Sequence, residues 1–231
     1  MPYYYYGYDP TYILVIIAFA LSLFASFGVK GTFAKYKKVR SSRGYTAADV
    51  ARKILDRNGL QHIRIEHVGG DLTDHFDPKS NVVRLSDSTF GSESVAAIGV
   101  AAHECGHAIQ HARGYAPIKI RNSIIPVVNI GSTISMPLFV IGLILGSYQL
   151  SLLGVILFSF VLVFQLVTLP VEFNASTRAM KILDTESMLF DEELKGARKV
   201  LTAAALTYVA AVAATALQLL RFVLILNRNR D

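Results

Sequence analysis

Long uncharged stretches of apolar residues constrain the fold of this 231-residue chain more than any other feature. Four stretches of 18 to 23 residues contain no charged side chain, and they cover residues 12–29, 124–146, 150–171 and 201–220. A helix rises about 1.5 Å per residue, so each stretch is about long enough to cross a hydrocarbon layer of roughly 30 Å. The sequence therefore predicts an α-helical membrane protein with about four transmembrane helices in a lipid bilayer.

The four stretches differ in detail. We do not expect the first to be a cleaved signal peptide, because no basic residue precedes it and no clear small-x-small cleavage site follows it. The tyrosines before it are predicted to anchor it at the membrane interface; they are Tyr3, Tyr4, Tyr5, Tyr6 and Tyr8. Prolines in the second stretch predict a kink or partial cover by protein. Arg221 follows the fourth stretch and leaves open whether that helix fully crosses.

The basic residues predict the orientation of the chain, whose formal net charge is +6. One group follows the first stretch (Lys30, Lys35, Lys37, Lys38, Arg40, Arg43, Arg52, Lys53 and Arg57), and a second follows the third stretch (Arg178, Lys181, Lys195, Arg198 and Lys199). Lys and Arg near the ends of spans are retained in the cytoplasm, so both groups are predicted to lie there. The groups adjoin spans and accompany no recognition motif, so nucleic acid is not an expected partner.

These patterns predict five segments. They are an N-terminal transmembrane anchor at 1–30, a cytoplasmic α+β portion at 31–123, a two-helix transmembrane hairpin at 124–171, a cytoplasmic helical segment at 172–200 and a C-terminal apolar helix at 201–231. Within 31–123 we expect a helix at 46–58 with Thr46 as its cap, strands at 63–68 and 82–86, a turn at 75–81 and a long helix at 94–112. The strand at 82–86 either holds an extended peptide by edge pairing or is purely structural.

The run His103-Glu104-Cys105-Gly106-His107 lies in the predicted helix 94–112. Residues i and i+4 share one helix face, so both imidazoles can reach one metal ion, and Glu104 can act as general base on a water activated by the metal. A surface helix with two solvated histidines is the alternative. It fits poorly because residues 95–102 are almost wholly apolar. The run therefore predicts a catalytic zinc site.

A catalytic zinc site usually has a third protein ligand, and Glu172 is the favoured candidate. It directly follows the third apolar stretch, where a carboxylate is costly unless it is paired; a glutamate extending to the interface is the alternative. Asp71, Asp74 and His75 are second candidates, although local turn hydrogen bonding explains them equally well; Asp184, Glu186 and Asp191 complete the set. His111 is excluded as a ligand because the i, i+8 spacing puts it about 12 Å from His103, and it is read as a polar or substrate-facing residue near the helix end.

Two further features concern catalysis. Cys105 is the sole cysteine, and we expect a small buried side chain there rather than a nucleophile, which would need its own base. The oxyanion of a hydrolysis intermediate needs a donor besides the metal, and the candidates are His75, Arg178 and Tyr208.

Four stretches together resemble the YugP-like membrane zinc metallopeptidases of bacteria, and they are residues 72–78, 100–110, 172–179 and 203–209. The layout is more distantly similar to the HtpX-like membrane gluzincins. The resemblance implies one zinc ion per chain held by His103, His107 and Glu172, with Glu104 as base, in a plasma-membrane enzyme that faces the cytoplasm. The distant relatives carry an aspartate four residues after the ligand glutamate to orient a histidine. This chain has Ser176 there, so Asn174, Ser176 or another acid is expected to orient the imidazole.

The expected protein is thus a multi-pass membrane zinc metalloendopeptidase with a small α+β, zincin-like portion. Its substrates would be proteins or peptides, and the resemblance suggests misfolded or membrane proteins. One alternative is a non-catalytic membrane scaffold with a structural metal, which would normally have four protein ligands. Another is a transporter, which the scarcity of charges in the spans disfavours. The sequence does not determine the oligomeric state.

Overall fold

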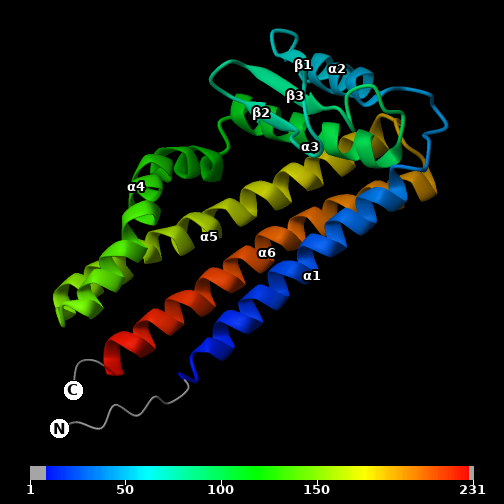
Figure 1. Ribbon diagram of the computed structural model, residues 1–231. Coiled ribbons are helices and arrows are strands. Elements are labelled where there is room, and N and C mark those ends of the chain that lie inside the picture. Colours follow the sequence, from blue (N-terminus) through cyan, green and yellow to red (C-terminus); the bar gives the residue numbers. More distant parts are fainter. Residues whose placement is uncertain (1–8, 229–231) are drawn as a thin grey trace, which may run out of the picture. The chain divides into compact units, whose positions relative to one another are not determined.

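The computed structural model describes residues 9–228, so the predicted interfacial tyrosines from Tyr3 to Tyr8 lie outside the described residues. The elements are labelled in Figure 1. In chain order they are α1 (Tyr12–Tyr36), α2 (Ala47–Arg57), β1 (Arg64–Val68), β2 (His75–Asp77), β3 (Val82–Ser86), α3 (Val95–Ala112), α4 (Ala116–Ile144), α5 (Tyr148–Thr185) and α6 (Asp191–Arg228).

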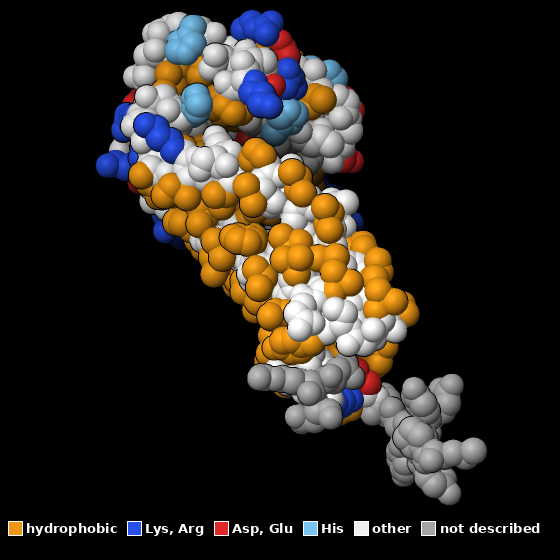
Figure 2. Space-filling model, turned by 90° about the vertical axis from the view of Figure 1, so that its left-hand side faces the viewer, with side chains coloured by type: hydrophobic (Ala, Val, Ile, Leu, Met, Phe, Trp, Pro, Cys, Tyr) orange, Lys and Arg blue, Asp and Glu red, His pale blue; other side chains and the backbone are white. Residues whose placement is uncertain are grey.

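Within residues 9–228, four helices are long and apolar enough to cross a membrane: α1, α4, α5 and α6. Large apolar side chains such as Phe19, Phe24 and Ile144 are 64%, 79% and 77% exposed on them. Figure 2 shows apolar side chains over much of the surface of the long helices. Apolar surface of this extent is expected where the surroundings are lipid rather than water. Together with the small sheet, these helices confirm the predicted fold class of an α-helical membrane protein with a small α+β portion.

The chain divides into two compact units, each built from separate parts of the sequence. One unit contains the residues up to Phe24, Ile124–Leu166 and the residues from Val209 onward. The other contains Ala25–Ser123 and Val167–Tyr208, and it holds the sheet, α2 and α3. The five segments expected from the sequence stay a prediction.

In the unit that contains Ile124–Leu166, helices pack through small residues. A Cβ atom added at Gly154 would lie 2.7 Å from the backbone nitrogen of Phe139, so α4 and α5 approach closely there. Arg221 does not end α6, which continues to Arg228. Its guanidinium pairs with Asp9 at 3.7 Å and donates to the Thr11 hydroxyl at 3.3 Å. This pairing explains how the helix accommodates a charge after its apolar stretch.

The sheet of the other unit has the order β1-β3-β2. β3 pairs in parallel with β1 and antiparallel with β2, so it is the central strand and has no free edge. The expectation that 82–86 holds a peptide by edge pairing is therefore wrong. The turn expected at 75–81 is also partly wrong, because His75–Asp77 forms the edge strand β2. A strand of three residues beside a proline is too short to produce a recognisable alternation.

The helix α3 forms as predicted. Ser94 caps it by accepting a hydrogen bond from the Ala97 N–H, and after Arg113 the chain turns at Gly114 with a φ of +64°. Thirteen of its 18 residues are buried. It packs on α2 and against β2 and β3, as Figure 1 shows, while Gly99 and Gly106 approach α6 and α5. A helix so enclosed can hold polar side chains only where each has a partner.

Gly106 allows α5 to lie directly against the helix that carries the histidines. A Cβ atom at this position would lie 2.7 Å from the Ala175 carbonyl oxygen, which is backbone and cannot yield by a rotamer change. Replacing Gly106 with Ala should therefore destabilise the fold by about 1–3 kcal/mol through overpacking and displace Glu172 and Ser176, which flank Ala175 on α5. Thermal unfolding and zinc titration would measure both effects.

Gly99→Ala is the matched control, since its added Cβ would meet Ala197 at 3.4 Å, close to ordinary contact. Equal unfolding temperatures and equal zinc affinities of the two variants would contradict close packing of α5 against Gly106.

Candidate metal centre

Three potential ligand atoms converge between α3 and α5. The Nε2 atoms of His103 and His107 lie 3.1 Å apart, and the Glu172 Oε2 atom lies 3.3 Å and 3.5 Å from them. The side chains of the three residues are 15%, 11% and 5% exposed. Among residues 9–228 they form the group of His, Cys, Asp and Glu side chains that could hold a metal ion. The structure thus brings together the three residues expected to be ligands.

The spacing and chemistry of these atoms fit zinc. A tetrahedral ion with bonds of about 2.0–2.1 Å has ligand atoms about 3.3–3.4 Å apart, close to the three distances observed. The Glu172 Oε2 atom is buried and has no hydrogen-bond partner within the described chain, and leaving such an atom without a cation would be costly. Two imidazoles and one carboxylate are the donor set of a catalytic zinc site, which keeps a fourth position for water.

The far side of each imidazole is held by a hydrogen bond. Gln110 donates its amide N–H groups to the Val171 carbonyl at 2.8 Å and the Asn174 Oδ1 atom at 3.0 Å, so its Oε1 atom faces His107. That oxygen lies 3.0 Å from His107 Nδ1 and can only accept, which places the proton on Nδ1 and the lone pair on Nε2. His103 Nδ1 lies 3.1 Å from the Ser176 hydroxyl. Both histidines are thus oriented toward Glu172.

Sequence reasoning missed two residues of this centre. Gln110 contacts His107, and Arg121 at the start of α4 places Nη1 3.5 Å from Glu172 Oε1. Arg121 therefore holds the glutamate oxygen that does not face the imidazoles. The position of Gln110, three residues after His107 on one helix face, was a weak signal; nothing in the sequence links Arg121 with Glu172.

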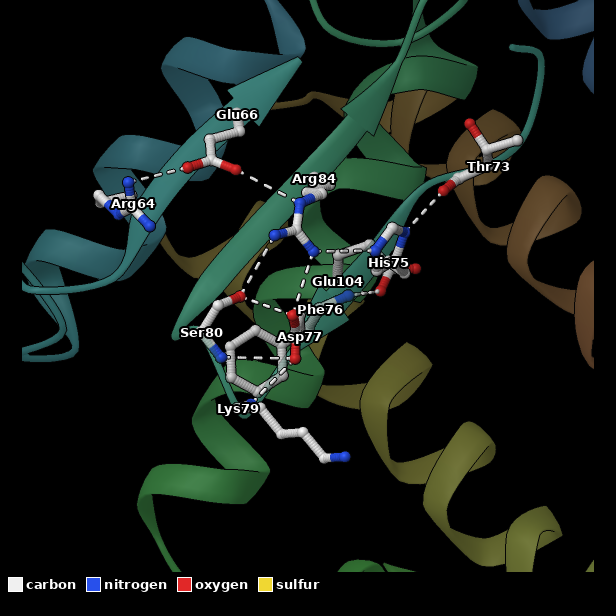
Figure 3. Close-up of polar contacts among 10 residues, drawn as sticks. All are labelled: Arg64, Glu66, Thr73, His75, Phe76, Asp77, Lys79, Ser80, Arg84 and Glu104. Atoms are coloured by element: carbon white, nitrogen blue, oxygen red, sulfur yellow. Dashed lines mark hydrogen bonds and ion pairs between the residues drawn. The ribbon is translucent and has the colours of Figure 1, made fainter. Parts of the chain in front are cut away.

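Glu104 is buried beside the ligands and is held by the sheet. Its Oε2 atom accepts a hydrogen bond from the Phe76 N–H of β2 at 3.0 Å, as Figure 3 shows. The carboxylate lines a cavity of about 290 Å³ together with His103, Glu172 and Tyr208. β2 thus fixes one oxygen of the expected base.

Polar contacts fix β2 itself (Figure 3). Arg84 of β3 bridges Glu66 of β1 at 3.3 Å and Asp77 of β2 at 3.1 Å. Asp77 also accepts from the Ser80 hydroxyl at 2.6 Å and the Lys79 N–H at 2.9 Å. These bonds, with that from Arg84, hold the pKa of the Asp77 carboxyl well below its usual range. Asp77 therefore stays charged and ties the short strand to its neighbours.

The other candidate residues occupy different surroundings. Asp74 accepts hydrogen bonds from the Ser86 N–H and hydroxyl, which is the turn bonding considered as its alternative role. His75 is exposed and lies 2.8 Å from the Thr73 carbonyl and 3.4 Å from Arg84. His111 is exposed, with its ring 5.9 Å from that of Phe76.

Arg178 donates to Asn174 at 2.7 Å and thereby fixes the amide that faces Gln110. Of the three oxyanion candidates, Tyr208 lines the cavity that contains Glu104 and the ligands. Tyr208 is therefore the one that remains placed for a donor role.

Cys105 is fully buried, and its thiol lies 3.6 Å from the Ala51 carbonyl. Burial, followed by the nearby charge of Glu104, raises the pKa of this thiol far above its usual value. A thiol that stays protonated is a poor nucleophile and a poor metal ligand, which fits the expected role as a small buried side chain.

Comparisons with known proteins agree with this centre. Residues 11–227 match a family described as "Putative neutral zinc metallopeptidase". The chain belongs to this family. It is 51% identical to "Putative membrane protease YugP" of Bacillus subtilis (strain 168) over 218 residues, which cover 94% of this chain and 97% of that protein. No solved structure matches. The match confirms the predicted family membership. The family description implies zinc and a peptide substrate, and the four apolar helices imply a lipid bilayer.

Proposed function

We propose that this protein is a membrane-embedded zinc metalloendopeptidase in which His103, His107 and Glu172 bind zinc and Glu104 is the general base. The observation that carries the proposal is the convergence of three donor atoms at 3.1–3.5 Å beside a buried glutamate. A structural site would normally have a fourth protein ligand, and the described residues contribute three.

Zinc bound here would supply Lewis acidity that polarises the scissile carbonyl and lowers the pKa of a water. Glu104 takes the proton from the attacking water and later passes it to the leaving amine. The Phe76 N–H holds one oxygen of Glu104, so the other is free to receive the proton. Tyr208 donates a hydrogen bond to the developing oxyanion. Arg121, Gln110 and Ser176 keep the ligands in place.

The orientation follows from the basic residues. Both groups of Lys and Arg belong to the unit that contains the metal centre, and basic residues near spans are retained in the cytoplasm. This supports an active site on the cytoplasmic side of the plasma membrane. The substrates are proteins or peptides that reach the bilayer surface, including misfolded and membrane proteins.

Chelation tests the proposal. Purified protein in detergent should cleave a fluorescently labelled unfolded protein, lose this activity in a zinc chelator and recover it when one equivalent of zinc is added. Metal content should be measured in the same samples. Equal cleavage by the metal-free protein would overturn the proposal, and one zinc per chain without any cleavage would favour the scaffold instead.

A further inference from the structure

A second cavity adjoins the metal pocket. It has a volume of about 430 Å³ and lies along α5 and α6, which run side by side in Figure 1. Ser176, Leu201 and Ala205 line both cavities. The groove therefore borders the metal pocket at these three side chains.

The groove contains two cations that the mechanism does not use, Lys181 from α5 and Arg198 from α6. Neither has an ion-pair partner within residues 9–228. Asp184 also lines the groove, so the formal net charge of the groove is +1. Cations without partners beside apolar walls favour a ligand that has a carboxylate and an apolar chain.

Distances along the helices place the two cations relative to the bilayer. The apolar stretch ends at Val171, and Lys181 follows ten residues later, which is about 15 Å along the axis and about 14 Å at an average tilt. The headgroup layer on one side of a bilayer is only about 5–8 Å thick. Lys181 therefore lies beyond the level of lipid phosphates, whereas Arg198, three residues before the apolar stretch that begins at Leu201, lies about 4.5 Å from that stretch and within the layer.

A peptide fits the same distance. Lys181 is nine residues from Glu172, about 14 Å along the helix, and an extended chain advances about 3.3 Å per residue. Four residues of an extended substrate therefore reach from the metal pocket to the two cations.

We infer that Lys181 and Arg198 bind a carboxylate of the substrate three to five residues from the scissile bond, so that the enzyme selects peptides with an acid at this position. The inference rests on the proposed peptidase function. The carboxylate is either an Asp or Glu side chain or the free C-terminus of the substrate, since both present the same group to a guanidinium.

Cleavage-site profiling tests the inference. The full-length protein would first digest a mixed peptide library, and mass spectrometry would locate each cut. It would then digest matched peptides that carry Asp, Lys or Ala at the selected position, and versions of these peptides with an amidated C-terminus. An exposed ion pair is worth up to about fivefold in binding, so two should favour the acidic peptide about tenfold over the Lys peptide. Loss of the preference on amidation would identify the C-terminus, and its retention would identify the side chain.

The variant Lys181→Glu/Arg198→Glu should reverse this preference, so that the Lys peptide is cleaved faster than the acidic peptide. Lys195→Glu/Lys199→Glu is the matched control. It changes the net charge of the protein by the same amount, but both residues lie on α6 and neither lines the groove. It should keep the acidic preference. The inference is overturned if the library shows no positional charge preference, or if the preference survives the reversal.

Binding provides a readout without turnover. Fluorescence anisotropy with the Glu104→Gln protein should show about tenfold weaker binding of the acidic peptide after the charge reversal.

If the unmodified protein cleaves nothing, the peptidase proposal fails and this inference fails with it. If it cleaves without charge selection, only the inference fails. If the charge reversal lowers the stability of the protein only in nanodiscs that contain anionic lipid, and leaves peptide binding and cleavage unchanged, the groove binds a lipid headgroup. That result would overturn the inference.

Discussion

Replacing Glu104 with Gln should lower kcat by about 10²–10⁴-fold, the usual contribution of a general base, while the protein keeps one zinc per chain. Gln has nearly the same shape, and its carbonyl oxygen can still accept the hydrogen bond from the Phe76 N–H. It cannot take a proton from water at neutral pH. Steady-state cleavage of a labelled unfolded protein, with metal analysis of the same preparation, measures both quantities.

A matched control is Glu192→Gln, which changes a fully exposed glutamate that pairs with Lys195 at the start of α6. This variant should keep full activity. Glu104 is not the base if Glu104→Gln retains kcat within threefold of the unmodified protein while Glu192→Gln does the same.

The second large effect is expected at Glu172. Replacing it with Ala should weaken zinc binding by more than about 100-fold, because removal of residues that only support a ligand already costs 10–100-fold. It would also leave the Arg121 guanidinium without its carboxylate and the two imidazole lone pairs facing one another at 3.1 Å. Competition with a chromophoric chelator measures the affinity.

Glu186→Ala is the control here, since Glu186 was also a candidate ligand and instead pairs with Arg57. Zinc affinity should be unchanged in this variant. If zinc affinity survives in Glu172→Ala and falls in Glu186→Ala, the third ligand has been wrongly assigned.

Much of the centre could be predicted because its signals are local. The apolar run 95–102 with Ser94 before it and Gly114 after it defines α3, and the i, i+4 spacing places His103 and His107 on one face. Glu172 stands out because a carboxylate at the end of an apolar stretch needs a partner. Each of these inferences uses residues that are neighbours in the sequence or in one helix.

The features that could not be predicted depend on contacts between distant segments. β2 is three residues long, and its place at the sheet edge follows from pairing with β3 rather than from its own pattern. The contact of Arg121 with Glu172 joins residues 51 positions apart. The close approach at Gly106 depends on Ala175 of another helix. Such contacts leave no periodic signal in one sequence.

X-ray absorption spectroscopy of the purified zinc protein would identify the atoms bound to the ion and so test whether His103, His107 and Glu172 are its ligands. We expect scattering from two imidazole rings and from oxygen at about 2.0–2.1 Å, with four ligands in total, and loss of this signature in Glu172→Ala. A sulfur ligand at about 2.3 Å, or a spectrum that Glu172→Ala leaves unchanged, would contradict this ligand assignment.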